Sequence, residues 1–309
     1  MATLYAVQPG KAPETLTLDE LWQGSDPLGG RYSQIVPVTL GETPYLIAVD
    51  GQGEATALAV TTGAPYLAAA GAFTLGQGWD VIEPFLLGSR PYLLAYQSKT
   101  GAFSIFALAD DLTVGRPFEY RRARPPGVTS GFDVTKPLAV NGLVSILTYS
   151  STNGTVNAYS LQMLSTPAAG SPEGAPALQI NPVWLHEWAR EWTRFAFFQL
   201  GGENFFLKTN VGKLNVNIDH VLDDPSQGTV EVGTYLTLDN ALDLNIVTAF
   251  YLGGGDPYFV AYMDSGATTL YRFHSDCQGW TKQLDASTVA KASLIVPIEV
   301  SGQTLLLIY

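Results

Sequence analysis

The sequence predicts an all-β fold, a six-bladed β-propeller built from four-stranded antiparallel blades. Three observations lead to this expectation: a composition typical of short strands, a strand pattern that recurs six times, and a repeat spacing that closes through the chain ends. Of the 309 residues, 31 are Gly, 19 are Pro and 46% are hydrophobic. Frequent Gly and Pro indicate many tight turns, and the hydrophobic share is large enough for a sizeable core.

Each repeat is marked by an apolar residue followed by a small or polar turn. A β-rich run precedes this anchor and a second apolar strand follows it, as QIVPVTL and PYLIAV do at the first turn. A third strand follows in most repeats. Strands joined in this way form an antiparallel meander, so we expect each repeat to be one four-stranded sheet. The anchors are Leu40, Leu87, Val140, Leu200, Leu252 and Val300.

The spacing of the anchors predicts a closed ring. Successive anchors are 47, 53, 60, 52 and 48 residues apart, and the path from the last anchor through the chain ends to the first is 49 residues. The two ends therefore supply one shared blade, and radial closure protects sheet edges that an open solenoid would expose. We expect one domain, 1–309, with blades near 30–76, 77–127, 128–181, 190–241, 242–292, and 293–309 joined to 1–24.

The longest spacing contains a segment unlike the repeats. In it Trp184, Trp188 and Trp192 recur at every fourth residue, which would place them on one face of a helix. We therefore expect a short helical insertion near 182–192. Its tryptophans would either roof a pocket at the rim where the first strands begin or pack the helix onto the propeller.

One repeat carries a resemblance to known proteins. The run GWDVIEPFLLGSRPYLLAYQSKTGAFSIFAL, residues 78–108, resembles tandem repeats of bacterial and fungal propellers with a W-x-x-I-x-P-F pattern, a Gly turn, a Y-L-L-x-Y strand and a following Gly. Such repeats are similar to FG-GAP-like and tachylectin-like propellers. Residues 128–162 and 193–219 depart from the pattern, and the Asp-rich calcium loops of FG-GAP repeats are absent. The resemblance implies a fold and no particular reaction.

Polar residues on the first strands are the candidate site residues, because these strands line the central channel of a propeller. Four residues before the anchors stand Glu83, Lys136 and Thr248, and six before them stand Gln34 and Arg194. This pattern predicts an asymmetric polar funnel in which Glu83 and Lys136, on neighbouring blades, face each other. The alternative interpretation is a water-filled channel plugged by a salt bridge.

The candidates divide into two roles. We assign proton transfer or charge stabilisation to Glu83, Lys136, Arg194 and His186, since an imidazole with an ordinary pKa of about 6.5 suits acid–base work. Small polar residues just before the strands are either ligand-binding groups or turn-forming groups. The ligand-binding candidates are Gln34, Asp80, Asp133, Asn245, Thr248, Trp79, Trp184, Trp188 and Trp192.

Three functions remain open at this stage. The residues that recur between blades are structural, whereas the polar ones differ, and this favours one asymmetric site over many equivalent glycan sites. The first function is binding of one small, partly apolar molecule or glycan in the funnel. The alternatives are a metal-independent lyase, isomerase or cyclase that uses the same funnel, and a protein-interaction propeller.

Composition argues against several partners. The formal charge of −12, from 28 acidic and 16 basic residues, repels polyanions, so we expect no nucleic-acid partner. No apolar run reaches about 18 residues, and the N-terminus lacks a signal-peptide pattern, so we expect no membrane partner and leave the compartment open. Three separated histidines and the single Cys277 indicate no metal site, and no cofactor motif is present.

Overall fold

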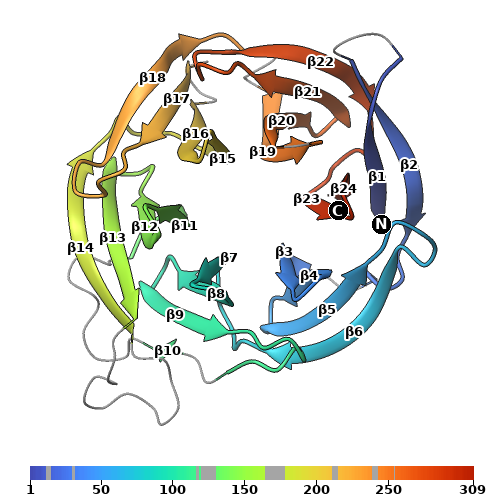
Figure 1. The fold of residues 1–309 in the computed structure, drawn as a ribbon, viewed down its shortest axis with the longest axis horizontal. Helices are drawn as coiled ribbons and strands as arrows, with labels where there is room; N and C mark the ends of the chain where they lie inside the picture. Colours follow the sequence, from blue (N-terminus) through green and yellow to red (C-terminus); the bar gives the residue numbers. More distant parts are fainter. Residues whose placement is uncertain are drawn as a thin grey trace.

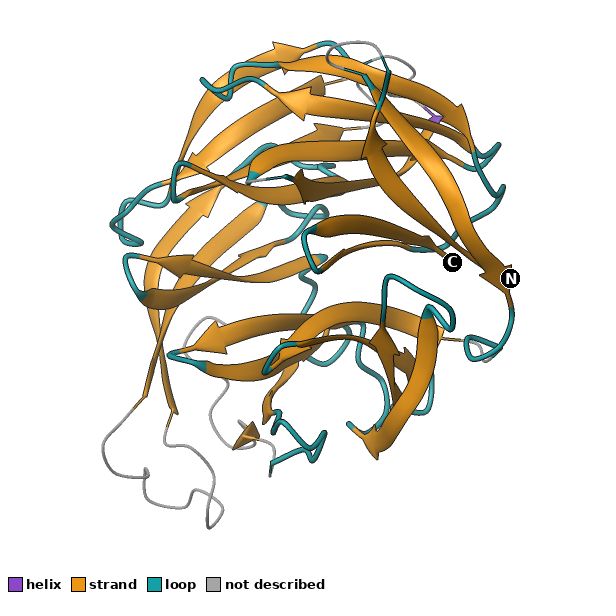
Figure 2. Cartoon of the chain, turned by 45° about the vertical axis from the view of Figure 1, so that its right-hand side comes forward, coloured by secondary structure: helices purple, strands orange, loops and turns teal. Residues whose placement is uncertain are grey.

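The computed structural model of the chain describes residues 1–11, 15–29, 32–115, 118–119, 130–163, 178–210, 215–238, 243–253 and 255–309. In this part, six four-stranded antiparallel sheets surround a central axis as the blades of a propeller (Figure 1). Figure 2 shows the same ring obliquely, with each blade a twisted sheet. The predicted fold class is confirmed. Within the described ranges no helix has the length and hydrophobicity of a membrane span.

In every blade the first strand lies nearest the axis and the fourth lies outermost (Figure 1). The first blade contains β3 (Tyr32–Leu40), β4 (Thr43–Asp50), β5 (Glu54–Val60) and β6 (Leu67–Thr74). The second contains β7 (Val81–Leu87), β8 (Arg90–Gln97), β9 (Ala102–Ala107) and β10 (Phe118–Glu119). The third contains β11 (Val134–Val140), β12 (Leu143–Tyr149), β13 (Thr155–Met163) and β14 (Leu178–Glu187).

The remaining blades follow the same order, and the last is shared by the chain ends. The fourth contains β15 (Arg194–Leu200), β16 (Glu203–Asn210), β17 (Asn215–Val221) and β18 (Thr229–Leu236). The fifth contains β19 (Leu244–Leu252), β20 (Asp256–Met263), β21 (Ala267–Phe273) and β22 (Trp280–Ser287). The sixth contains β23 (Ile295–Val300), β24 (Gln303–Ile308), β1 (Ala2–Pro9) and β2 (Leu16–Gly24).

The shared blade closes the ring as the anchor spacing predicted. Its strand order is β2-β1-β24-β23, and β1 pairs with β24 from Thr3 opposite Ile308 to Val7 opposite Thr304. Both chain ends lie in this blade (Figure 1). The N-terminal strand is therefore an interior strand of its sheet, with a hydrogen-bonded neighbour on each side.

The expected helix near 182–192 is wrong. Residues Leu178–Glu187 form β14, which pairs antiparallel with β13 and extends the third blade beyond the expected boundary at 181. A spacing of four residues fits the two-residue period of a strand as well as the 3.6-residue period of a helix. Trp184 and His186 accordingly stack on one face of β14, while Leu185 points away and is 74% exposed.

Recurring tyrosines at the ends of the second strands tie four of the six blades to the next. In four blades the hydroxyl oxygen accepts a hydrogen bond from the backbone N–H of the residue eight positions before the next anchor. Tyr149 and Tyr262 also donate to a backbone carbonyl, that of Ala189 and that of Val289 respectively. The four pairs are Tyr96 with Phe132 at 3.2 Å, Tyr149 with Trp192 at 3.3 Å, Tyr262 with Ala292 at 2.8 Å, and Tyr309 with Tyr32 at 3.1 Å.

Candidate functional site

A cavity of about 610 Å³ lies along the axis of the propeller. Its walls come from the first strands β3, β7, β11, β15, β19 and β23, together with the residues just before several of them. The predicted funnel residues are therefore brought together. Those that line the cavity are Gln34, Asp80, Glu83, Asp133, Lys136, Arg194, Asn245 and Thr248.

Glu83 of β7 and Lys136 of β11 form an ion pair between neighbouring blades inside this cavity. The Lys136 Nζ lies 2.6 Å from Glu83 Oε2, and the side chains are 28% and 26% exposed. The same ammonium lies 5.7 Å from the centroid of the Phe197 ring, which belongs to β15 of the next blade. Because the other first strands carry uncharged residues at this position, the pair makes the cavity asymmetric. Those residues are Val36, Ala196, Thr248 and Val296.

The acidic and amide residues at the strand starts hold turns of their own blades. Asp80 Oδ2 accepts hydrogen bonds from the backbone N–H and the hydroxyl of Ser98, both at 2.7 Å. Asp133 makes the same two contacts with Ser151 at 2.6 Å. Asn245 Oδ1 accepts from the backbone N–H of Asp264 at 2.7 Å. These residues thus carry a structural task at the mouth of the cavity, and their part in ligand binding stays a prediction.

Gln34 and Arg194 connect neighbouring blades. The Gln34 amide donates to the backbone carbonyl of Asp80 at 2.8 Å, and Arg194 Nε donates to that of Asn245 at 2.6 Å. Both acceptors lie seven residues before the anchor of the following blade. Arg194 Nη1 also donates to the carbonyl of Thr193 at 3.0 Å. The guanidinium is therefore held against the backbone at the rim of the cavity.

The aromatic candidates and His186 lie outside the cavity lining. Trp184 and His186 belong to β14, the outermost strand of the third blade (Figure 1). Trp79 donates its indole N–H to the carbonyl of Leu75 at 2.8 Å, and Trp192 is only 4% exposed. The tryptophans near 182–192 do not line the cavity, and Trp188 and Trp192 lie against Lys208 of the fourth blade without the helix that was expected. Their part in ligand binding stays a prediction.

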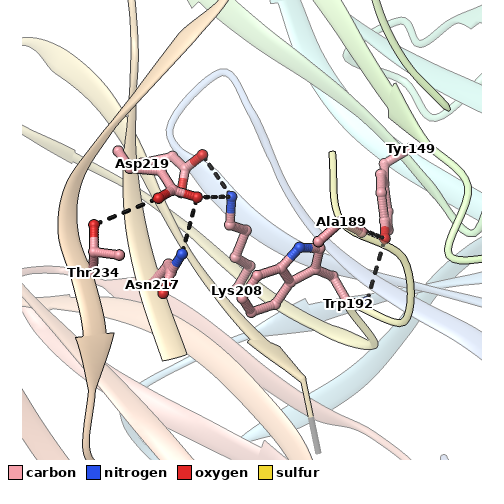
Figure 3. A network of polar contacts seen from close by, with 8 residues as sticks. Tyr149, Ala189, Trp192, Lys208, Asn217, Asp219 and Thr234 are labelled. Carbon is pink, nitrogen blue, oxygen red and sulfur yellow. Dashed lines mark hydrogen bonds and ion pairs between the residues drawn. The ribbon is translucent and has the colours of Figure 1, made fainter. Parts of the chain in front are cut away.

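A second polar cluster, which the sequence analysis missed, lies in the fourth blade and extends from buried residues to the surface (Figure 3). Lys208 of β16 and Asp219 of β17 are each 1% exposed, and their Nζ and Oδ2 atoms lie 2.8 Å apart. Glu231 of β18 adds a second carboxylate, 3.2 Å from the same ammonium. The ammonium also lies 4.6 Å and 4.9 Å from the ring centroids of Trp188 and Trp192. This Lys208 cluster joins the segment after β14 to the fourth blade.

Burial dominates the electrostatics of the Lys208 cluster. It raises the pKa of Asp219 to about 6, although Lys208 acts to lower it and Glu231 raises it slightly. Asp219 Oδ1 has no hydrogen-bond partner among the described residues. The sequence carried a signal for this cluster, because Lys208 occupies a second-strand position that is Ala in three other blades. Those residues are Ala48, Ala95 and Ala261.

Across the described ranges, no three His, Cys, Asp or Glu side chains gather closely enough to hold a metal ion. Cys277 is buried, and burial raises the pKa of its thiol to about 11, which keeps it protonated at neutral pH. Neither observation adds a reactive group to the axial cavity, whose chemistry therefore comes from the residues described above.

No protein-family model matches the chain, and neither does any curated protein. Several solved structures are similar to the chain. A protein from Bacteroides uniformis, described as a putative 6-phosphogluconolactonase, is 14% identical with a TM-score of 0.54, and the similarity covers 95% of this chain and 84% of that one. A similarly described protein from Bacteroides fragilis is 12% identical with a TM-score of 0.52, over 96% and 86%. A periplasmic gluconolactonase from Pseudomonas aeruginosa is 11% identical with a TM-score of 0.52, over 97% and 99%. The chain shares a propeller fold with these proteins.

Proposed function

We propose that the protein binds one small, partly apolar molecule or glycan in the axial cavity. The observation that carries the proposal is the Glu83–Lys136 ion pair, which places one charged contact beside the Phe197 ring in a cavity of about 610 Å³. Small-molecule sites are typically concave, mostly apolar and roughly 300–1,000 Å³ in volume, with a few converging polar groups. The cavity has these properties.

Asymmetry supports one site rather than a set of equivalent ones. Glu83 and Lys136 stand at a first-strand position that is uncharged in the four other blades. The groups that repeat between blades, such as the second-strand tyrosines, are engaged in hydrogen bonds that join blades. A ligand on the axis would therefore meet a different residue on each side, and it would bind in one orientation.

Thermal-shift screening against a panel of glycans, sugar lactones and small amphipathic metabolites tests the proposal. The decisive comparison is between the wild type, the channel variant Glu83→Gln and the control Asp285→Asn. The control removes an exposed carboxylate of the fifth blade, whose Oδ2 lies 2.8 Å from Lys282 Nζ and whose side chain is 61% exposed. Both variants make the same change of net charge.

We expect at least one compound to stabilise the wild type and the control but not the channel variant. Binding that survives in the channel variant would place the site elsewhere. A panel that stabilises none of the three proteins counts against the ligand-binding function itself.

A metal-independent enzyme is the second candidate, because a carboxylate and an ammonium in contact inside a cavity can exchange a proton with a bound molecule. The test is prolonged incubation of the panel compounds with wild-type protein in the presence of a chelator, followed by NMR detection of new products. Product formation that is lost in Glu83→Gln favours catalysis. Ligands that bind and return unchanged favour binding alone.

A further inference from the structure

Both cationic side chains of the axial cavity are held against acceptors of the protein, whereas two of its carboxylates keep oxygen atoms without a hydrogen-bond partner among the described residues. Lys136 donates to Glu83, and Arg194 directs Nε and Nη1 to backbone carbonyls. Glu83 Oε1 and the carboxylate of Glu299, which also lines the cavity, form no hydrogen bond with the described residues. A cationic ligand is therefore better matched to this cavity than an anionic one.

The charge of the lining residues also favours a cationic ligand. The described lining residues include four carboxylates, those of Asp80, Glu83, Asp133 and Glu299, and two cationic side chains. The formal excess of negative charge in the cavity has the same sign as the net charge of −12 for the whole chain. A concave, partly apolar site concentrates such a field, so cations are attracted to it and anions are repelled.

The position of the Lys136 ammonium shows what kind of group fits. It lies 2.6 Å from a carboxylate oxygen and 5.7 Å from the centroid of an aromatic ring. A carboxylate beside an aromatic face is the environment that holds organic ammonium groups, because the charge and the ring quadrupole both attract a cation. Lys136 reaches this position on a flexible four-carbon stem and is 28% exposed, so it can leave toward water.

Resting on the proposed function, we propose that the ligand of the axial cavity carries an ammonium group, which displaces that of Lys136 and binds between Glu83 and the Phe197 ring. Lys136 is then an internal competitor for the site. This assignment predicts two opposite effects: removal of Glu83's charge weakens binding, whereas removal of Lys136's charge strengthens it.

Three probes of one shape but different charge test the assignment: choline, 3,3-dimethylbutan-1-ol and 3,3-dimethylbutanoate, with butylamine as a smaller primary amine. Their dissociation constants are measured by calorimetry at low ionic strength. We expect choline or butylamine to bind the wild type at least about ten-fold more tightly than the alcohol, and the carboxylate not to bind. Lys136→Met should tighten ammonium binding by about ten-fold, and Glu83→Gln should weaken it by a similar factor.

Asp285→Asn is the matched control, because it makes the same change of net charge as Glu83→Gln at an exposed site outside the channel. It should leave the dissociation constants unchanged. Melting temperatures of all variants, measured first, establish that each is folded.

Two results would overturn the ammonium assignment while leaving the proposed function intact. The first is a carboxylate or alcohol that binds as tightly as choline and butylamine. The second is ammonium binding that is indifferent to both Glu83→Gln and Lys136→Met. If neither these probes nor any compound of the wider panel binds, the proposed function fails as well.

Discussion

Asp219→Asn is the most direct test of the electrostatics of the Lys208 cluster. In the folded protein burial raises the pKa of Asp219 from 3.8 to about 6. In the unfolded chain the carboxyl returns to an ordinary pKa of about 3.9. Between these two values the folded state binds a proton that the unfolded state does not. The contribution of this carboxyl to stability is therefore fully present at low pH and is lost as the pH rises from about 4 to about 6.

The size of the effect follows from the two pKa values. Their difference corresponds to ~3 kcal/mol, since each pKa unit is worth about 1.4 kcal/mol. Asn keeps an oxygen that can accept from Lys208 but does not titrate. The free energy of unfolding of the wild type minus that of Asp219→Asn should therefore fall by about 2–3 kcal/mol between pH 4 and pH 7, and then stay level.

Urea unfolding of both proteins at several pH values measures this difference, and carboxyls common to both cancel. Asp285→Asn is the control, because the pKa of the exposed Asp285 is lowered by its hydrogen bond from Lys282. Its difference curve should have the opposite slope. Parallel curves for the wild type and Asp219→Asn would refute the argument that burial controls this carboxyl.

Four further predictions concern stability. Lys208→Met leaves the carboxylates of Asp219 and Glu231 without their cation, so the free energy of unfolding by urea should fall by about 3–5 kcal/mol. A loss below about 1 kcal/mol would contradict a buried ion pair between Lys208 and Asp219. Tyr262→Phe removes two hydrogen bonds to the backbone at the entry to the sixth blade and should lower the free energy of unfolding by about 1–3 kcal/mol in the same assay. An unchanged free energy of unfolding would contradict a stabilising role for these bonds. Gly266→Ala should lower the free energy of unfolding by about 2 kcal/mol or more beyond the loss caused by Gly202→Ala. Both glycines have φ near +87°, but only at Gly266 would a Cβ lie 2.5 Å from a backbone carbonyl oxygen. Equal losses would mean that the backbone conformation alone determines the cost. Deletion of residues 1–9 removes β1 from between β2 and β24, so circular dichroism should show no cooperative melting, and a truncated chain that melts like the wild type would disprove the closure.

The polar lining of the axial cavity was largely predictable because its residues occupy equivalent positions in a repeat. Alignment of the six anchors placed Glu83 and Lys136 at the same height on neighbouring first strands, and the structure brings them to 2.6 Å. The same alignment identified Gln34 and Arg194. What it could not supply was their partners, because the carbonyls of Asp80 and Asn245 that they bind belong to the following blades.

The tryptophan segment shows why local pattern was insufficient there. Trp184 and Trp188 are spaced by four residues, which fits both a helix and a strand. From Leu178 to Glu187 the chain is a strand because β13 offers unpaired backbone groups along its outer edge, which β14 satisfies. Trp188 and Trp192 follow this strand in irregular chain. A contact between distant segments decided the conformation, and no window of the sequence contains both partners.

The sequence by itself determined the number of blades, the closure through the chain ends and the polar funnel, because these follow from residues that recur at nearly constant spacing. Only the tertiary structure decided that Trp188 and Trp192 enclose the ammonium of Lys208, and that Asp219 is buried against it. The physical reason is that burial and charge pairing depend on which side chains meet between strands and between blades, whereas periodicity depends only on the order of residues along the chain.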